Sequence, residues 1–287
     1  MDLVLYLLIG LVIHLAILFV IIRKKFLRWP DGIIIAALFS IIIFISQLLF
    51  WIVLFAFFIP SSILTKMNLK RKRNKIISEK SGNRNGVQVI SNSLGLFLFA
   101  LFQLFVSGVN GKLVFPFLIG GIIFVASASA DTWSTEIGTL NKSDPRYILN
   151  FKKIVPKGTS GGVTLLGNLG GLLGATLIAL VSITYLIVVK ISLTLTDIIS
   201  IFLFITILGF LGQIVDSLLG ATLQKKYFCP VCKLYIENSS HQDCNTQNLK
   251  KMKNNTILDN NSVNLSANFC MSIIGVLLII IIHFNPL

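Results

Sequence analysis

Apolar residues fall along this chain in long runs separated by polar segments, without the alternation typical of a half-buried strand. Seven runs have the approximate bounds 3–22, 33–59, 87–106, 113–130, 161–189, 197–223 and 266–284. A bilayer crossing needs roughly 20 mostly apolar residues at 1.5 Å per residue. The pattern therefore predicts an all-α polytopic membrane helix bundle of about seven transmembrane helices, forming one integral membrane domain over residues 1–287.

Composition agrees with this interpretation. Hydrophobic residues make up 55% of the chain and charged residues only 13%, whereas a soluble domain carries about a quarter charged residues. The first run has neither a basic segment before it nor a small-residue cleavage site after it, so we expect a retained span and not a signal peptide. A soluble globular domain is excluded.

The formal net charge of +14 comes from 25 Lys and Arg against 11 Asp and Glu. The basic residues lie in the segments between apolar runs. This placement indicates charges that set topology and attract anionic lipid head groups. We therefore expect membrane lipid as a partner and no nucleic acid, while an anionic substrate remains compatible with the charge.

The distribution of basic residues predicts an orientation. The segments 61–86, 131–160 and 224–265 contain 8, 5 and 6 Lys or Arg, and the three other loops contain 4, 1 and 1. The positive-inside rule then gives a multi-pass protein of the cell membrane, with the basic loops, the active site and the N-terminus in the cytoplasm and the C-terminus outside. The four bases after the first run conflict with this layout. Either the rule is violated there or the first two runs are not two simple crossings.

Carboxylates at or within apolar runs are candidate functional groups, because an ionised side chain in the bilayer is costly. Asp216 lies in GQIVDSLLGATLQ, and Asp131 and Glu136 lie in SASASADTWSTEIG. Positions five apart diverge by about 140° on a helix, so Asp131 and Glu136 could share one ligand only if the helix breaks between them. The alternative is a structural hydrogen-bonding role.

A glycine-rich segment, KGTSGG, opens the fifth run. Backbone N–H groups and a lysine at a helix N-terminus are suited to phosphate binding. The spacing is not that of a P-loop, and Gly-Thr-Ser is also an ordinary helix cap. The candidate anion-binding residues are Lys157, Gly158, Thr159, Ser160, Gly161 and Gly162.

A polar stripe opens the third run. Gln88 and Asn92 are four residues apart and share a helix face, Asn85 precedes Gln88 by three, and Arg84 comes just before. Such a stripe should face the bundle interior, either to bind a polar ligand or to bond a neighbouring helix. Asn264, which leads into the last run, is expected on the same side of the membrane.

Small residues recur in the fifth run, where Gly167, Gly171 and Ala175 are four apart on one face. This spacing permits close approach of two helix backbones in lipid. An unwound stretch lining a cavity is the alternative.

The basic segment 224–265 contains a possible zinc knuckle. Cys229, Cys232, His241 and Cys244 follow a C-x2-C-x8-H-x2-C spacing. Four nitrogen and sulfur ligands suit tetrahedral, structural Zn²⁺. Reduced cytoplasmic thiols are the alternative.

Six segments, which span roughly residues 80 to 270, together resemble the domain of unknown function 92 family. They are GNRNGVQVISN, SADTWSTEIGTL, FKKIVPKGTSGGVTLLG, DSLLGATLQ, CPVC with HQDC, and LDNNSVN. The family is similar to transmembrane protein 19 and includes a plant phytyl-phosphate kinase. The resemblance implies a membrane kinase that converts a phytyl- or geranylgeranyl-type isoprenoid monophosphate to the diphosphate, with CTP or another nucleoside triphosphate as donor.

The candidate residues are compatible with phosphoryl transfer, which depends mostly on positioning and charge neutralisation. Asp131 and Asp216 could hold Mg²⁺, with Glu136 as a possible third ligand. Lys157 and the glycine-rich segment could bind donor phosphates. The acceptor phosphate could contact Arg84 and be oriented by Asn85, Gln88 and Asn92.

Two other functions compete with the kinase. A transporter or flippase would use Asp216 and the glycine-rich span as an intramembrane site near the midplane. A non-catalytic assembly factor would use the cysteine segment for docking. The depth of the carboxylates separates the first two hypotheses, because a kinase site should lie near the cytoplasmic surface.

Overall fold

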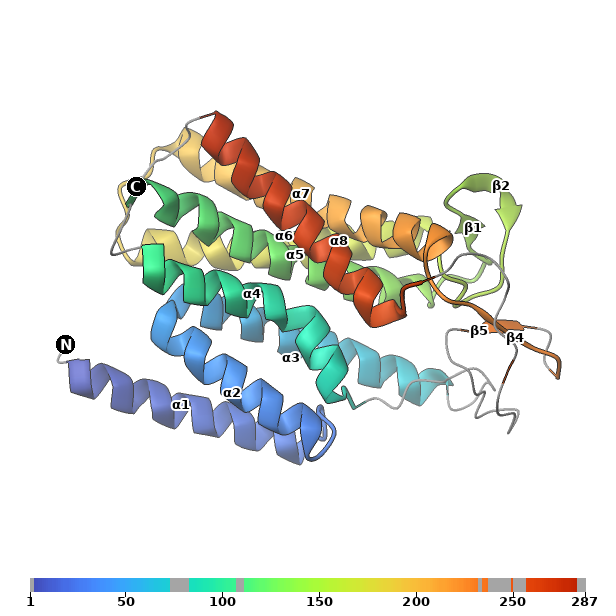
Figure 1. Ribbon diagram of the computed structural model, residues 1–287, viewed down its shortest axis with the longest axis horizontal. Coiled ribbons are helices and arrows are strands. Elements are labelled where there is room, and N and C mark those ends of the chain that lie inside the picture. The colour runs from blue at the N-terminus through green and yellow to red at the C-terminus, as the bar shows by residue number, and fades with distance from the viewer. Residues whose placement is uncertain are drawn as a thin grey trace.

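The computed structural model describes residues 3–72, 83–106, 111–231, 234–236, 249 and 257–282. Helices dominate this part of the chain (Figure 1). They are α1 (Leu3–Arg23), α2 (Asp31–Ser46), α3 (Leu48–Lys72), α4 (Gly86–Val106), α5 (Val114–Gly138), α6 (Leu165–Val188), α7 (Leu195–Thr222) and α8 (Asn260–Ile281). A short 3₁₀ turn, Gly111–Leu113, leads into α5.

Six of these helices, α3 to α8, are long and apolar enough to cross a membrane. The two helices that precede them are also apolar, and α2 has only 16 residues. The prediction of an all-α polytopic membrane bundle is confirmed.

The run predicted as one long span over 33–59 is two helices, which corrects the expected layout. Gln47 adopts an extended conformation, with φ −157° and ψ 109°, and separates α2 from α3. Apolar residues flank this break on both sides, so hydropathy alone does not reveal it. The predicted run ended at residue 59, just before Pro60, whereas α3 includes Pro60 and continues to Lys72.

The additional helix resolves the conflict in the charge distribution. Successive helices run in opposite directions, so α1, α3, α5 and α7 all end at one end of the bundle (Figure 1). Arg23, Lys24, Lys25 and Arg28 therefore lie at the same end as the other basic segments, here called the basic end. The expected position of the N-terminus was wrong, because α1 begins at the opposite end, where α8 also finishes.

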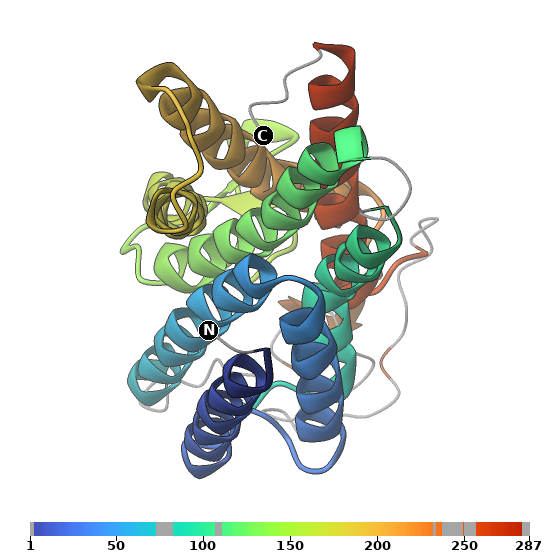
Figure 2. The same cartoon turned by 90° about the vertical axis from the view of Figure 1, so that its left-hand side faces the viewer.

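Helix α5 is the centre of the bundle. It packs against α3, α4, α6, α7 and α8, and every residue from 118 to 130 is buried (Figure 2). Its run of Ala and Ser leaves room for close neighbours.

The packing of α6 on α5 depends on glycine. A Cβ on Gly174 would lie 2.8 Å from the Ser129 carbonyl oxygen, and one on Gly170 would lie 2.9 Å from that of Trp133. The predicted close backbone approach is confirmed. Helix α6 is continuous, so its glycines serve packing and do not form an unwound stretch.

Short strands cover the basic end (Figure 1). Between α5 and α6, β1 (Arg146–Tyr147) pairs antiparallel with β2 (Asn150–Ile154) and with β3 (Gly162–Val163), in the order β2-β1-β3. After α7, β4 (Tyr227–Cys229) and β5 (Leu234–Ile236) form an antiparallel hairpin in which Cys229 lies opposite Leu234. The first sheet holds the glycine-rich segment against the ends of the helices.

Candidate functional site

A polar cavity of about 210 Å³ lies at the basic end, among the ends of helices α3 to α8. Its lining brings together segments that are far apart in the sequence. The predicted residues that line it are Arg84, Gln88, Asn92, Asp131, Glu136, Lys157, Gly158, Thr159, Ser160, Gly161, Gly162, Asp216 and Asn264. The cavity therefore joins the proposed metal ligands, the proposed anion loop and most of the polar stripe.

The two principal carboxylates come from different helices at similar depths. Asp131 lies seven residues before the end of α5, and Asp216 lies six residues before the end of α7. At 1.5 Å per residue, both lie about 10 Å inside the helix ends. Both thus lie between the midpoint of their helix and the basic end.

Asn264, in the second turn of α8, connects these carboxylates. In one orientation of its amide, Nδ2 donates to Asp131 Oδ2 at 3.4 Å. In the other orientation, the nitrogen donates to Asp216 Oδ2 at 2.9 Å and to the Asn260 carbonyl oxygen at 2.8 Å. One amide therefore spans the space between Asp131 and Asp216. Oxygen atoms from three helices converge at this point.

Glu136 lines the same cavity, but its carboxylate is bonded to a neighbouring helix. Thr65 Oγ1 donates to Oε1 at 2.9 Å, and Asn68 Nδ2 donates to Oε2 at 2.8 Å. The side chain is only 8% exposed. These bonds connect α5 to α3. Glu136 therefore stabilises the packing of the two helices, and we no longer expect it to be a metal ligand.

Arg84 is held in place by its own backbone. Its N–H donates to the Phe26 carbonyl at 3.0 Å, and its carbonyl accepts from the Arg28 N–H at 2.9 Å. The guanidinium carbon lies 5.1 Å and 5.4 Å from the ring centroids of Phe57 and Phe58. Burial lowers the pKa of Arg84 to about 10, while the Glu136 carboxylate opposes that shift. Arg84 thus remains a cation at neutral pH.

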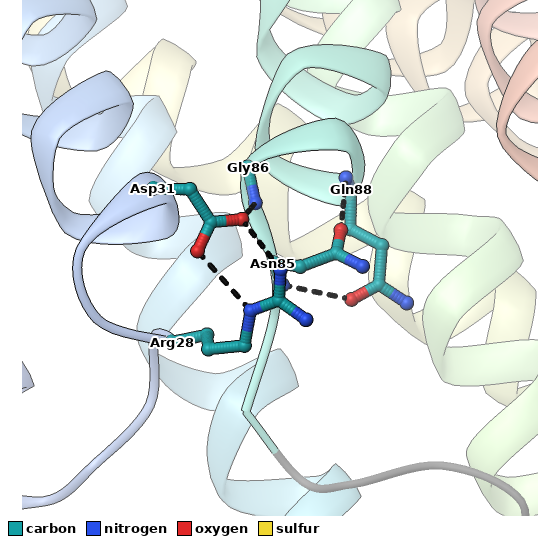
Figure 3. A network of polar contacts seen from close by, with 5 residues as sticks. All are labelled: Arg28, Asp31, Asn85, Gly86 and Gln88. Atoms are coloured by element: carbon teal, nitrogen blue, oxygen red, sulfur yellow. Dashed lines mark hydrogen bonds and ion pairs between the residues drawn. The ribbon is translucent and has the colours of Figure 1, made fainter.

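The polar stripe divides into a helix cap and a cavity wall (Figure 3). Asn85 Oδ1 accepts from the Gln88 N–H at 2.9 Å, and Gln88 Oε1 accepts from the Asn85 N–H at 3.1 Å. This reciprocal pair is a capping box for α4. Asn85 lies outside the cavity lining, and its side chain caps the helix, so we no longer assign it a ligand contact.

The start of α4 is also bonded to α2. Asp31 Oδ2 accepts from the Gly86 N–H at 2.7 Å, and the Arg28 guanidinium donates to both carboxylate oxygens of Asp31 (Figure 3). A Cβ on Gly32 would lie only 2.6 Å from the Arg84 carbonyl oxygen, so α2 packs directly on this segment. These contacts fix the position of Arg84.

The glycine-rich segment is a compact turn with two left-handed residues. Gly158 has φ +86° and Gly161 has φ +82°. A Cβ on Gly161 would also lie 2.5 Å from Ala221 Cβ, so this residue must be glycine for the turn to contact α7. Lys157 donates through Nζ to the Asn141 carbonyl.

The expected direct entry from this segment into a helix is corrected. Strand β3 follows the turn, and α6 begins at Leu165 with Thr164 as its N-cap. Thr164 Oγ1 accepts from the Gly167 N–H at 2.9 Å. The two positive φ angles explain the difference, because right-handed helix cannot continue through them.

Several lining residues were not among the predicted site residues. They are Thr65, Thr132, Ser134, Thr135, Gly138, Thr139, Pro145, Val163, Thr164, Gly167, Ser217, Gly220, Gln224, Asn260 and Asn261. Most are hydroxyl or amide residues near helix ends. Thr65, on α3, could have been found only by knowing that α3 extends past Pro60.

The cysteine segment is described only in part. Cys229 is buried at the end of β4, whereas Cys232, His241 and Cys244 lie outside the described residues. Within the described part of the chain, no group of three or more His, Cys, Asp or Glu side chains could hold a metal ion. A cation at the polar cavity would therefore bind two carboxylates together with amide oxygens.

The chain was compared with known proteins. Residues 12–272 match the family described as Integral membrane protein DUF92. This chain belongs to that family. The family identity agrees with the bundle of apolar helices and with the resemblance found in the sequence.

Several curated proteins are similar to this DUF92 chain. Protein PGR of Arabidopsis thaliana is 33% identical over 251 residues, which cover 78% of this chain and 80% of that protein. The Uncharacterized membrane protein MJ0933 of Methanocaldococcus jannaschii is 30% identical over 268 residues, which cover 93% of this chain and 92% of that protein. Protein VTE6, chloroplastic, also of Arabidopsis thaliana, is 30% identical over 125 residues, which cover 43% of this chain and 37% of that protein. No solved structure matches.

Proposed function

We propose that this DUF92 protein is a membrane kinase that transfers the terminal phosphoryl group of CTP or another nucleoside triphosphate to an isoprenoid monophosphate. The observation that supports this proposal is the convergence of Asp131, Asp216 and Asn264 with a glycine turn and a half-buried arginine around one cavity. Such a site combines groups that bind a cation with groups that bind phosphate. The substrate class comes from the family resemblance.

The donor set at Asp131 and Asp216 fits Mg²⁺. This ion takes oxygen ligands and is often bound by one or two carboxylates together with substrate phosphates. Asn264 orients this pair, because its amide nitrogen donates to Asp216 Oδ2 at 2.9 Å and to the Asn260 carbonyl oxygen at 2.8 Å. A cation here would bind the carboxylate oxygens of Asp131 and Asp216. When bound, Mg²⁺ would neutralise charge on the transferred phosphoryl group.

The glycine turn supplies the donor-phosphate site in this proposal. Lys157 and the backbone of 158–162 line the cavity on the side of α7. The positive φ angles of Gly158 and Gly161 create a concave turn. The Thr159 and Gly162 N–H groups donate within it, to the Pro156 and Thr159 carbonyls, so the anion would face the other N–H groups of the turn. Lys157 would leave its contact with the Asn141 carbonyl to bind a phosphate oxygen.

Arg84 binds the acceptor phosphate, with Gln88 and Asn92 beside it on α4. An oxygen of the acceptor phosphate attacks the terminal phosphorus of the nucleotide. The new P–O bond forms as the bond to the bridging oxygen breaks, and the nucleoside diphosphate leaves with the electron pair. The acceptor is already anionic near neutral pH, so no side chain has to remove a proton.

The depth of the carboxylates favours this function over a transporter. Asp131 and Asp216 both lie about 10 Å from the ends of helices that contain 25 and 28 residues. A transporter site is expected near the bilayer midplane. A soluble nucleotide could reach the basic end directly. We assign that end to the cytoplasm on the positive-inside rule.

The cysteine segment is a separate proposal. Cys229 lies at the end of β4, where the chain turns toward β5. A knuckle formed with Cys232, His241 and Cys244 would hold structural Zn²⁺. Loss of bound zinc on substitution of Cys229 by Ser would support it, and unchanged zinc content would contradict it.

The test is an assay of the purified protein with radiolabelled CTP or ATP, Mg²⁺ and geranylgeranyl or phytyl monophosphate. We expect labelled isoprenoid diphosphate that requires Mg²⁺. Absence of product with every pair of donor and acceptor, together with solute flux in proteoliposomes, would contradict the kinase and favour the transporter.

A further inference from the structure

A second cavity, almost entirely apolar, adjoins the polar one. It is a groove between α1, α2, α3 and α4 that is partly open to its surroundings and encloses about 40 Å³, compared with about 210 Å³ for the polar cavity. Its lining includes Leu18 and Ile21 of α1, Ala36 and Phe39 of α2, and Leu54 of α3. This apolar pocket shares two residues, Arg84 and Asn92, with the polar cavity.

The two shared residues mark a sharp change in chemistry. On the polar side, Arg84 lines the cavity together with Glu136. On the apolar side, its guanidinium lies against the rings of Phe57 and Phe58. This junction suits a molecule that is anionic at one end and hydrocarbon at the other.

The hydroxyl groups in the apolar pocket do not make it polar. Ser40 Oγ donates to the Ala36 carbonyl at 2.6 Å, and Ser93 Oγ donates to the Val89 carbonyl at 2.6 Å. Both hydroxyls are thus bonded within their own helices. The remaining wall is aliphatic and aromatic, which suits an alkyl or isoprenoid chain and not a hydrated solute.

The direction of the pocket matches that of a membrane lipid. Arg84, which lines both cavities, comes just before α4 begins, and Ser93 of the apolar pocket lies seven residues after Gly86, the first residue of α4. At 1.5 Å per residue, the pocket extends about 10 Å toward the apolar middle of the bundle. A lipid with its head group at the basic end would have its chain in this direction.

We infer that the apolar pocket between α1 and α4 binds the hydrocarbon chain of a single-chain lipid monophosphate, with the phosphate at Arg84. This inference rests on the proposed function for the role of that lipid as the phosphoryl acceptor. It makes α1 to α3 the part of the chain that selects the acceptor, whereas α5 to α8 hold the cation and the nucleotide.

Photolabelling can test this location without any turnover. The full-length protein would be irradiated with geranylgeranyl monophosphate carrying a diazirine on its chain, and the labelled peptides identified by mass spectrometry. We expect labels on the lining of α1 to α4 and competition by unlabelled monophosphate at least ten times stronger than by the corresponding alcohol. Labels confined to the outer surfaces of α6 to α8, or equal competition by the alcohol, would overturn the inference.

A matched pair of variants sharpens the test. Ala36 lines the pocket, whereas its neighbour Ala37 does not. A36F should reduce labelling at least tenfold, A36L should reduce it less, and A37F should leave it unchanged. Equal effects of A36F and A37F would contradict the assignment. If A36F does not fold, A36L and the labelling map of the unmodified protein decide the result.

Photolabelling and the diphosphate assay, performed on the same purified protein, distinguish a failure of this inference from a failure of the kinase proposal. Labelling of the pocket without diphosphate formation would support the lipid site and contradict the kinase. Diphosphate formation with labels elsewhere would support the kinase and overturn the lipid site.

Discussion

Asn264 of α8 donates through its amide nitrogen to the Asp216 carboxylate of α7, 2.9 Å from Oδ2. The other position of the same amide lies 3.4 Å from Asp131 Oδ2 of α5. Three helices separated by long stretches of sequence thus meet at one polar point. The proposed chemistry depends on this convergence.

Asp131→Asn and Asp216→Asn should each reduce phosphoryl transfer by about 100-fold or more, because charge neutralisation supplies most of the catalysis in such reactions. The steady-state rate of diphosphate formation measures this loss. Asp197→Asn is the matched control, since Asp197 caps the opposite end of α7 through Thr194. A comparable loss in the control would show that the effect is structural.

Asn264→Leu removes the amide between the carboxylates without changing their charge. We expect the Mg²⁺ concentration for half-maximal activity to rise about 10- to 100-fold, as is typical when a group that orients metal ligands is lost. A titration of activity against Mg²⁺ measures the shift. Asn150→Ala is the control, because Asn150 is exposed on β2. An unchanged Mg²⁺ requirement would remove Asn264 from the site.

Gly161→Ala should disturb the glycine turn more than Gly158→Ala. Both positions have φ above +80°, which costs a residue with a Cβ about 1 kcal/mol or more. Only Gly161 would also place a Cβ 2.5 Å from Ala221 Cβ, and overpacking adds about 1–3 kcal/mol. Thermal unfolding in detergent and the KM for nucleotide should both change more for Gly161→Ala. Equal effects would mean that the contact with α7 is unimportant.

The N-cap of α8 gives a prediction about pH. The Ser262 N–H donates to Asp259 Oδ1 at 2.8 Å and lowers the pKa of this carboxyl below its ordinary value of 3.8. A carboxyl with a lowered pKa contributes stability that is fully present above its ordinary pKa and is lost as pH falls below it. Asp259→Ala should cost about 1 kcal/mol at neutral pH.

The measurement is the difference in melting temperature between Asp259→Ala and the unmodified protein, taken from pH 7 to below pH 3. We expect that difference to shrink at the acidic end. Asp259→Asn keeps an N-cap without a titrating group and should stay close to the unmodified protein at pH 7. A difference that is independent of pH would show that the carboxylate charge does not matter.

Much of the bundle could be predicted from hydropathy, since α4 to α8 each correspond to one apolar run. The break at Gln47 could not, because two adjacent polar residues, Ser46 and Gln47, between two apolar helices leave the hydrophobic run intact. The sign of this break in the sequence was the group of four basic residues after α1, which conflicted with the layout predicted from the positive-inside rule. The distribution of basic residues thus indicated a turn that the hydropathy pattern did not reveal.

The site was predicted in composition but not in detail. The sequence singled out Asp131 and Asp216 because a charged residue within an apolar run is costly in a bilayer and usually has a function. It singled out the glycine turn because its residue types suit anion binding. The bonds of Glu136 to Thr65 and Asn68 depend on the packing of α3 against α5, which has no local signal in the sequence. Asn85 was misassigned because a capping box and a ligand contact require the same residue types.

The central claim is that carboxylates of α5 and α7 hold one divalent cation at the basic end. Fe²⁺ substituted for Mg²⁺, with ascorbate and peroxide, cleaves the backbone next to the bound metal, and the fragments can be sequenced. We predict simultaneous cleavage near Asp131, Asp216 and Asn264, suppressed by excess Mg²⁺ and abolished in Asp131→Asn. Cleavage near only one of the three, or persistence of the full pattern in Asp131→Asn, would contradict the account.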